Sequence, residues 1–394
     1  MKLLLALALL AQQQQGDDKT PPPDQINKAI DRGVEILLQS VDVDAGHEWL
    51  RCDELILFAL AHAGKAADPR TKKLLDRVLK SDLNTGAHPT YNVSLRAMAL
   101  AQIDPVKHQV AIAQAAWWLV NAQTDNGQWD YWSLKDKPPA SFPKIAWPGK
   151  QATGEKTKAE MGLQVKRTSP WTDHPPSINK VLRNTSTAQY ATLGLYAAHR
   201  SHVIIPAEIW DRTLKSVLSG QGRGGGWGYI HTEDKGNDWL KELPGFTQVN
   251  RSMTASQLSV LAVLKAVLET PPRDIDSAMD RGFKWLSEDL ILKRAGAMKG
   301  PTYKGADTTS VYWHYWLYSV ERAGILWGRE RIGDKWWYAQ GANELLRLQN
   351  PDGSWGQDFG TSTDRPADTA FAVLFLKRAV PPPVATGGKE PENK

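Results

Sequence analysis

The residues best suited to acid/base chemistry stand on one predicted helix and at the start of another. Asp307, His314 and Tyr318 are separated by steps of seven and four residues, which places them near one face of an α-helix. Asp368 stands near the start of the last predicted helix. A carboxyl group beside an imidazole could transfer protons. We therefore predict Asp307, Asp368 and His314 as catalytic residues, with a hydrogen-bonded core histidine as the structural alternative.

Aromatic residues cluster around His314 in the sequence. Flat rings can line a ligand cavity or fill the wedges between packed helices, and the residue types leave both uses open. The whole chain has 17 Trp, more than its 10 Tyr or 7 Phe, so this choice concerns much of the protein. The predicted ligand-binding residues are Tyr312, Trp313, Tyr315, Trp316, Tyr318, Tyr91 and Asp53.

Two kinds of predicted helix alternate along the chain and would position these residues. The first kind is amphipathic with a charged face, and is expected at 26–39, 71–83, 106–122, 207–218, 275–290 and 335–348. The second kind is apolar nearly all round, and is expected at 52–63, 91–102, 186–198, 253–268, 308–324 and 367–379. Six such hairpins closed into a ring predict an all-α fold, an α/α toroid with an inner barrel and an outer ring.

Parallel inner helices would bring their N-termini together at one mouth of the barrel, where partial positive charges favour acids or anionic ligands. Polar residues stand at each predicted start, and ordinary N-capping explains them as well as a ligand site does. They are Asp53, Thr90, Asn92, Ser186, Thr187, Ser252, Thr254, Asp307, Thr308, Thr309, Asp364, Asp368 and Thr369. Neighbouring turns add His88, Tyr91, Arg96, Tyr229 and His231 as further candidates.

The toroid is expected to span residues 26–380, with one irregular insertion. Residues 133–183 contain seven Pro and little periodicity. Long loops inside compact domains are often functional lids, so we expect an ordered flap across one mouth of the ring. Residues 12–25 and 381–394 are polar and proline-rich, which predicts a disordered linker and a disordered tail.

Composition and the N-terminus limit the partners. Residues 1–11 have one lysine and then an apolar run, which predicts a signal peptide and export to the periplasm or the extracellular space. That run is too short to span a bilayer, although contact with a membrane surface stays open.

The net charge of +5 comes from scattered basic residues, so no nucleic acid is expected. Cys52 is the only cysteine, which excludes an internal disulfide. We expect neither a metal nor a cofactor.

A repeated motif supports the array of hairpins. A Gln is followed six residues later by a Trp, across a glycine-containing turn, at the ends of three expected outer helices. Glycine there allows a positive φ, and the glutamine amide could bind an unpaired carbonyl group that the indole covers. We therefore predict structural roles, without chemistry, for the pairs Gln123 and Trp129, Gln221 and Trp227, and Gln349 and Trp355.

The segment Gln349-Asn-Pro-Asp-Gly-Ser-Trp355-Gly356 resembles the repeat of squalene-hopene and oxidosqualene cyclases. The hairpin pattern is also similar to the toroid of these cyclases and of protein prenyltransferase β subunits. The resemblance covers roughly residues 26–380. It implies a terpenoid-cyclase-like toroid and an apolar, isoprenoid-like ligand in a central aromatic cavity.

The acid that this family uses is not in place. Hopene-type cyclases carry Asp-x-Asp-Asp-Thr-Ala, and the segment Ala367-Asp368-Thr369-Ala370 aligns with its end, which puts Ala367 at the position of the proton donor. Protonating an alkene needs a strong, well-placed acid. Cyclase chemistry is therefore not expected from this motif, and whether the protein is an enzyme stays open; if it is one, the resemblance implies an isomerase or a transferase. The alternatives are a carbohydrate-active toroid, a hydrolase or lyase with two carboxylates, and a noncatalytic scaffold of the cell envelope.

Overall fold

The computed structural model describes residues 18–42, 52–84, 86, 88–131, 134, 136–147, 161–168, 184–229, 248–288, 290, 292–293, 312–356 and 364–378. The expected signal peptide, the expected tail and the two residues Asp307 and His231 lie outside this part of the chain.

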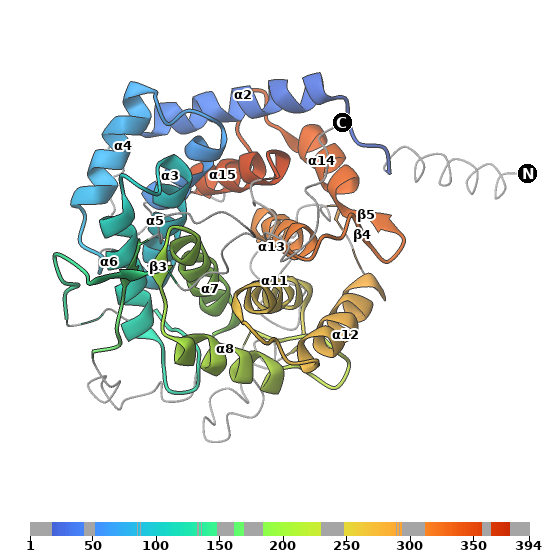
Figure 1. Ribbon diagram of the computed structural model, residues 1–394. Coiled ribbons are helices and arrows are strands. Elements are labelled where there is room, and N and C mark those ends of the chain that lie inside the picture. Colours follow the sequence, from blue (N-terminus) through green and yellow to red (C-terminus); the bar gives the residue numbers. More distant parts are fainter. Residues whose placement is uncertain are drawn as a thin grey trace, which may run out of the picture.

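Helices of an outer and an inner layer alternate along the described chain (Figure 1). The outer helices are α2 (Pro23–Ser40), α4 (Pro69–Lys80), α6 (Gln109–Ala122), α8 (Ala207–Ser219), α12 (Asp274–Glu288) and α14 (Trp337–Leu348). The inner helices are α3 (Asp53–His62), α5 (Pro89–Ile103), α7 (Thr185–Arg200), α11 (Arg251–Val267), α13 (Trp313–Leu326) and α15 (Asp364–Leu376).

The inner helices form a closed barrel. Each contacts the next along the chain, and the last, α15, packs on the first, α3, and on α2 (Figure 1). The six outer helices surround this barrel. The predicted α/α toroid is therefore confirmed, and no sheet takes part in closing the ring among the described residues.

The sequence explains the two layers. In α4, Thr71, Leu74 and Val78 recur at helical spacing and are buried, whereas the charged side chains take the other faces. Asp68 caps this helix by accepting a hydrogen bond from the Arg70 backbone N–H. The inner helix α7 is buried nearly all round from Thr185 to Tyr196, as a helix between the outer ring and the barrel axis must be.

One outer helix differs from the expectation. The segment 106–122 was expected to have a charged face, but α6 has no acidic or basic residue, and both Trp117 and Trp118 are buried. The reason is the insertion. Its strands β1 (Lys144–Ala146) and β2 (Met161–Gln164) form a small sheet with β3 (Val203–Ile204), and β2 and β3 contact α6.

The described parts of the insertion therefore cover an outer helix, and they do not form the expected flap across a mouth. The Asn121 side chain of α6 donates to the Lys166 carbonyl oxygen and accepts from the Thr168 backbone N–H, at 3.3 and 2.8 Å. Leu163 and Val165 are buried beside it. An apolar outer helix needs this cover, because its exposed face would otherwise lie in water.

Two helix boundaries also differ. Helix α2 begins at Pro23, inside the range 12–25 expected to be a disordered linker, and the preceding Asp18 and Lys19 accept hydrogen bonds from Gln340 and Asn343 of α14. The segment expected to start a helix at residue 335 instead forms β5 (Lys335–Trp336), which pairs with β4 (Arg331–Ile332) around a turn. Gly333 at that turn has a φ of +64°, which ends the strand and delays the helix.

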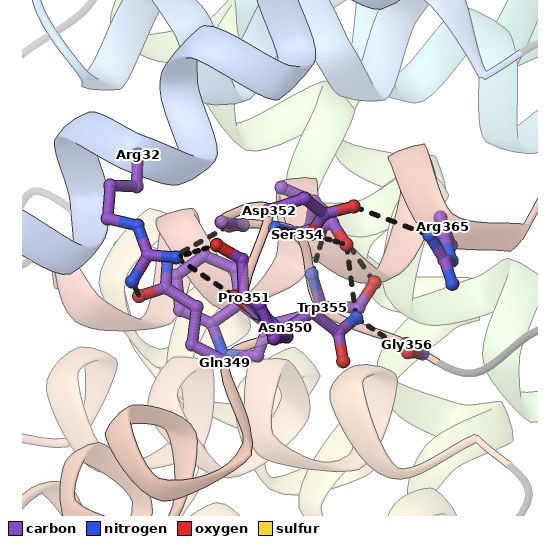
Figure 2. A network of polar contacts seen from close by, with 11 residues as sticks. Arg32, Gln349, Asn350, Pro351, Asp352, Ser354, Trp355, Gly356 and Arg365 are labelled. Carbon is purple, nitrogen blue, oxygen red and sulfur yellow. Dashed lines mark hydrogen bonds and ion pairs between the residues drawn. The ribbon is translucent and has the colours of Figure 1, made fainter.

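The three Gln–Trp motifs connect consecutive outer helices. Gln349 donates through Nε2 to the Gly353 carbonyl oxygen of its own turn at 2.9 Å, and to the Ala29 carbonyl oxygen of α2 at 2.8 Å. Figure 2 shows this turn with Arg32 of α2 reaching toward it. Gln123 binds the Ile209 carbonyl of α8, and Gln221 that of Ala278 in α12. Each glutamine side chain thus donates hydrogen bonds to carbonyl oxygens of two successive repeats.

Each tryptophan of the motif also has two fixed contacts. The buried indole N–H groups of Trp129, Trp227 and Trp355 donate to the carbonyl oxygens ten residues earlier, at 2.7, 2.9 and 2.8 Å. The backbone of each tryptophan is hydrogen-bonded to a threonine of the following inner helix. These threonines are Thr187, Thr254 and Thr369, and each precedes a fully buried alanine. The motif therefore ties the outer helix to its own inner partner as well as to the next repeat.

Glycine in these turns permits the close approach of the next outer helix. Gly225 has a φ of +102°, and a Cβ atom there would lie 2.5 Å from the Arg281 carbonyl oxygen of α12. Gly353 would clash in the same way with Arg32 of α2. By contrast, Gly64 has a φ of +74° and no atom within 4 Å of such a Cβ.

We expect Gly225→Ala to lower the free energy of unfolding by roughly 3 kcal/mol, and Gly64→Ala by only about 1 kcal/mol. Both alanines adopt a positive φ, but only residue 225 meets a rigid backbone atom of the next helix. Urea unfolding followed by circular dichroism measures both values. Equal losses would show that the turn does not set the spacing of the outer helices.

Candidate functional site

Two of the predicted catalytic residues meet at the start of neighbouring inner helices. His314 of α13 places Nδ1 3.0 Å from Oδ1 of Asp368 in α15. The imidazole is only 3% exposed, whereas Asp368 is 28% exposed. In the described part of the chain, Nε2 of His314 has no hydrogen-bond partner. A carboxylate beside one ring nitrogen and a second ring nitrogen without a partner is an arrangement suited to proton transfer.

The surroundings hold this pair in place. Trp313, next to His314, is buried and donates its indole N–H to the Leu292 carbonyl oxygen at 3.0 Å. A Cβ atom on Gly356, which has a φ of +100°, would lie 2.6 Å from Oδ2 of Asp368. The glycine that follows the third Gln–Trp motif therefore leaves room for the carboxylate.

The structure gives a physical reason for the residues around Asp368 that resemble the cyclase motif. Thr369 and Ala370 are equivalent to the Thr–Ala pairs at 187–188 and 254–255, and Thr369 binds the backbone of Trp355. The Thr–Ala part of the motif is thus a structural repeat of this toroid. Ala367, which has no carboxyl group, packs against the core.

A second group of polar residues joins four segments at the same end of the barrel. The Tyr91 hydroxyl of α5 lies 2.5 Å from the Ser186 hydroxyl of α7. The Tyr131 and Tyr229 hydroxyls contact each other, and Asn184 donates to Tyr229 at 3.0 Å. The imidazole of His88 packs on the Tyr131 ring, with the centroids 4.4 Å apart.

The repeat explains how Tyr131 and Tyr229 come to meet. Each stands two residues after the tryptophan of a Gln–Trp motif, Trp129 or Trp227. Equivalent positions of neighbouring repeats face the same end of a toroid. This regular spacing could have identified Tyr131 from the sequence, where it was missed along with Asn184, Gln189 and Ser256.

Aromatic rings occupy the barrel axis in the described structure. The Tyr190 ring of α7 lies with its centroid 4.9 Å from that of Tyr91, 6.2 Å from Tyr315 and 6.0 Å from Tyr318. The Tyr315 hydroxyl donates to Oε1 of Gln189 and lies 2.8 Å from the Ser256 hydroxyl. Burial raises the pKa of Tyr315 and Tyr190 well above the usual range, so both phenols stay neutral. These rings contact one another where the central cavity was expected.

Charged residues lie at the opposite end of the barrel. The Arg322 guanidinium packs on the Tyr318 ring at 4.3 Å, near the C-terminal end of α13. Its Nε is 3.2 Å from Oε2 of Glu321, within ion-pair distance, but the orientation is not that of a hydrogen bond. Burial raises the pKa of Glu321 to about 7, and burial lowers the pKa of His62 to about 3, aided by Arg322 and Lys377.

The remaining predicted residues are separated from one another. Asp53 forms an ion pair with Arg77 on the flank of the barrel, with Oδ2 2.6 Å from Nε. Tyr312 is exposed before α13, and Trp316 is fully buried inside it. No described residues form a group of three or more His, Cys, Asp or Glu suited to a metal ion. No described helix is both long and apolar enough to cross a membrane.

Known proteins match this chain in structure only. No protein-family model and no curated protein matches it. A possible member of the GH105 family from Salmonella enterica serovar Paratyphi A has 13% identity and a TM-score of 0.52, over 92% of this chain and 95% of that one. This likeness shows the fold alone.

Two structures of the type II terpene cyclase MstE from Scytonema match with lower TM-scores. Its complex with geranylgeranyl dihydroxybenzoate has 14% identity and a TM-score of 0.48, over 90% of this chain and 97% of that one. Its apo structure has 13% identity and a TM-score of 0.49, over 90% of this chain and 99% of that one.

The raised pKa of Glu321 predicts a pH-dependent stability. The folded-state pKa of about 7 lies above the ordinary value of 4.5, so folding favours the protonated acid. This contribution is complete below pH 4.5 and is lost as the pH rises through 7. The unfolding free energy of the wild type should fall between pH 5 and pH 8. In Glu321→Gln this fall should be smaller by on the order of 2 kcal/mol.

Urea titrations at both pH values measure this difference. The control is Glu269→Gln, at an exposed position, which should keep the wild-type dependence. A Glu321→Gln protein with an unchanged pH dependence would show that this carboxyl group is ionised in the fold.

Proposed function

We propose that the protein binds a hydroxylated, carbohydrate-like ligand at the mouth where the inner helices begin, and that His314 and Asp368 act there as an acid/base pair. The observation that carries this proposal is the 3.0 Å contact between the His314 ring and the Asp368 carboxylate. The proposed site combines this pair with the tyrosine, serine and asparagine groups of the same mouth.

The chemistry of the mouth favours a polar ligand. Sugars are bound by aromatic faces together with hydrogen-bonding groups. Tyr91, Tyr131 and Tyr229 supply both, and their hydroxyl groups already form contacts with Ser186, with Asn184 or with each other. Ligand hydroxyl groups could take over these contacts with little loss of hydrogen bonding.

An isoprenoid-like ligand has less support from the described residues. It would need an apolar cavity on the barrel axis, where the rings of Tyr190, Tyr315 and Tyr318 pack together. The neighbouring side chains there are polar as well, since Gln189 and Ser256 bind the Tyr315 hydroxyl. Opening this region would leave buried hydroxyl groups without partners, at a cost of about 1–3 kcal/mol for each group.

The acid/base pair would work through Nε2 of His314, which is buried, so a ligand must displace the side chains that cover it. In this proposal His314 carries its proton on Nδ1, 3.0 Å from Oδ1 of Asp368, and the lone pair on Nε2 would take a proton from a ligand hydroxyl group. The carboxylate then stabilises the imidazolium that forms. The deprotonated hydroxyl oxygen would attack the anomeric carbon, the glycosidic C–O bond would break, and the leaving oxygen would take the proton from Nε2, which restores the neutral ring.

Export forms a second part of the proposal. The basic and then apolar residues 1–11 support a signal peptide, and extracellular or envelope polysaccharides would then be accessible to the protein. N-terminal sequencing of the protein from separated cell fractions tests this. A cytoplasmic protein that keeps Met1 would overturn the export proposal and leave the ligand proposal standing.

Ligand binding is tested with an oligosaccharide array, followed by isothermal titration calorimetry of the glycans that bind. Tyr229→Phe removes a hydroxyl group that contacts Tyr131 and Asn184, and should weaken binding by about 5- to 10-fold. The control is Tyr338→Phe, whose hydroxyl donates to the Leu376 carbonyl oxygen away from the mouth and should leave affinity unchanged. Failure of every glycan to bind, together with a lipid that copurifies in native mass spectrometry, would favour the apolar ligand.

Catalysis is tested on the same glycans by mass spectrometry of the products. Asp368→Asn should reduce turnover by at least about 100-fold, because the amide no longer stabilises the imidazolium, while glycan affinity changes less than about threefold. Asp352→Asn, in the third Gln–Trp turn, serves as the control for nearby charge. Glycan binding without any turnover in the wild type would identify a binding protein and refute the acid/base role.

A further inference from the structure

A groove on the flank of the barrel lies outside the proposed mouth site. It has a volume of about 900 Å³ and is formed by the start of α3, the outer helix α4 and the start of α5. His314 and Asp368 do not line it. The residues that bear on its chemistry are Asp53, Glu54, Lys72, Asp76, Arg77 and Lys80.

Glu54 is a mostly buried carboxyl group in this groove, and no cationic side chain among the described residues forms an ion pair with it. It is 9% exposed and interacts with its own backbone N–H in the first turn of α3. In the described part of the chain, no other side chain donates a hydrogen bond to it. Arg77 donates instead to Asp53 at 2.6 and 2.9 Å and to the Val41 carbonyl oxygen at 3.2 Å.

Two cations of the groove are free of ion pairs with the described residues. They are Lys72 and Lys80, both exposed on α4. Lys73, also in the lining, binds Asp42 at 2.6 Å. With Lys73 paired to Asp42 and Arg77 paired to Asp53, Lys72 and Lys80 face only Asp76, so the groove has a small excess of positive charge when Glu54 is protonated.

The surroundings favour the neutral form of Glu54. Burial raises the pKa of its carboxyl group to about 7, and neighbouring Asp53 adds to this rise, whereas Arg96 and Arg77 oppose it. Asp76, Lys72, Lys73 and Lys80 of α4 complete the charged groups around the groove. A protonated carboxyl group is a hydrogen-bond donor, and it needs an acceptor when it is buried.

We propose that this groove is a second binding site, which takes a small ligand with a carboxylate or phosphate group, held by Lys72 and Lys80 and by a hydrogen bond from the Glu54 carboxyl group. This inference does not rest on the proposed function of the mouth. The ligand oxygen supplies the acceptor that the Glu54 proton needs, and its charge balances the two free lysines.

Proton linkage follows from this arrangement. An anion beside Glu54 disfavours its ionised form, so binding above neutral pH takes up a proton. The affinity should therefore fall by up to about tenfold for each pH unit above 7. Salt should weaken binding as well, because the lysines are exposed.

The experiment measures the binding of inorganic phosphate and of a hexuronate tetramer by isothermal titration calorimetry at pH 6.0 and pH 8.5. A neutral hexose tetramer of the same linkage is the control ligand. We expect at least one anion to bind about tenfold more weakly at pH 8.5, and the neutral tetramer not to bind in this groove. Titrations in buffers of different ionisation enthalpy report the proton taken up.

Variants separate the roles of the side chains. Glu54→Gln, which keeps a donor, should retain binding and lose the pH dependence. Lys72→Gln combined with Lys80→Gln should weaken binding by at least about tenfold, while Lys284→Gln, on α12, leaves it unchanged. Circular dichroism and a thermal melt establish that each variant is folded.

Several outcomes would overturn the proposal. One is that neither anion binds the folded wild type at pH 6.0. Another is an affinity that is the same at both pH values, or that survives loss of both lysines. A folded Glu54→Gln protein that keeps the wild-type pH dependence would assign the proton to another group. The inorganic phosphate and lysine-variant results test the groove alone and leave the binding of neutral glycans at the mouth as a separate question.

Discussion

The toroid depends on hydrogen bonds that pass from one repeat to the next. A helix end leaves carbonyl groups without partners, and a ring of hairpins must satisfy them while its helices pack closely. Gln123, Gln221 and Gln349 each bind a carbonyl oxygen of their own turn and one of the next outer helix. Since each tryptophan is also tied to its inner helix, the motif fixes both layers at once.

The proposed chemistry uses positions that these structural contacts create. Tyr131 and Tyr229 are placed at the mouth by the tryptophans two residues before them, and Gly356 after the third tryptophan makes room for Asp368. The axis itself is filled by tyrosine rings. The toroid scaffold thus presents the side chains of the proposed site at one end, apart from the contacts that hold the repeats together.

Periodicity predicted the six hairpins within a few residues, because burial follows regular spacing in both layers. It was wrong for α6, because the expected charged face rested on residues before Gln109, and the pairing of the insertion with β3 that covers the helix is a long-range contact. Sequence reasoning selected His314 and Asp368 and linked them to Asp307, but their direct pairing across two helices depends on the ring. Glu54 was missed because its chemistry comes from burial and from Arg77 being bound to Asp53, neither of which is a sequence pattern.

The hydrogen bond from Gln349 to the Ala29 carbonyl oxygen joins the last hairpin of the toroid's sequence to the first. Until the last hairpin has been synthesised, α3 and α2 have no α15 or α14 to pack against, and their apolar faces stay open to solvent. The nascent chain therefore contains an incomplete ring of hairpins during most of its synthesis, which proceeds at about 5–20 residues per second. Closure of the ring, a single late and long-range event, is the step at which such a chain either completes its fold or aggregates.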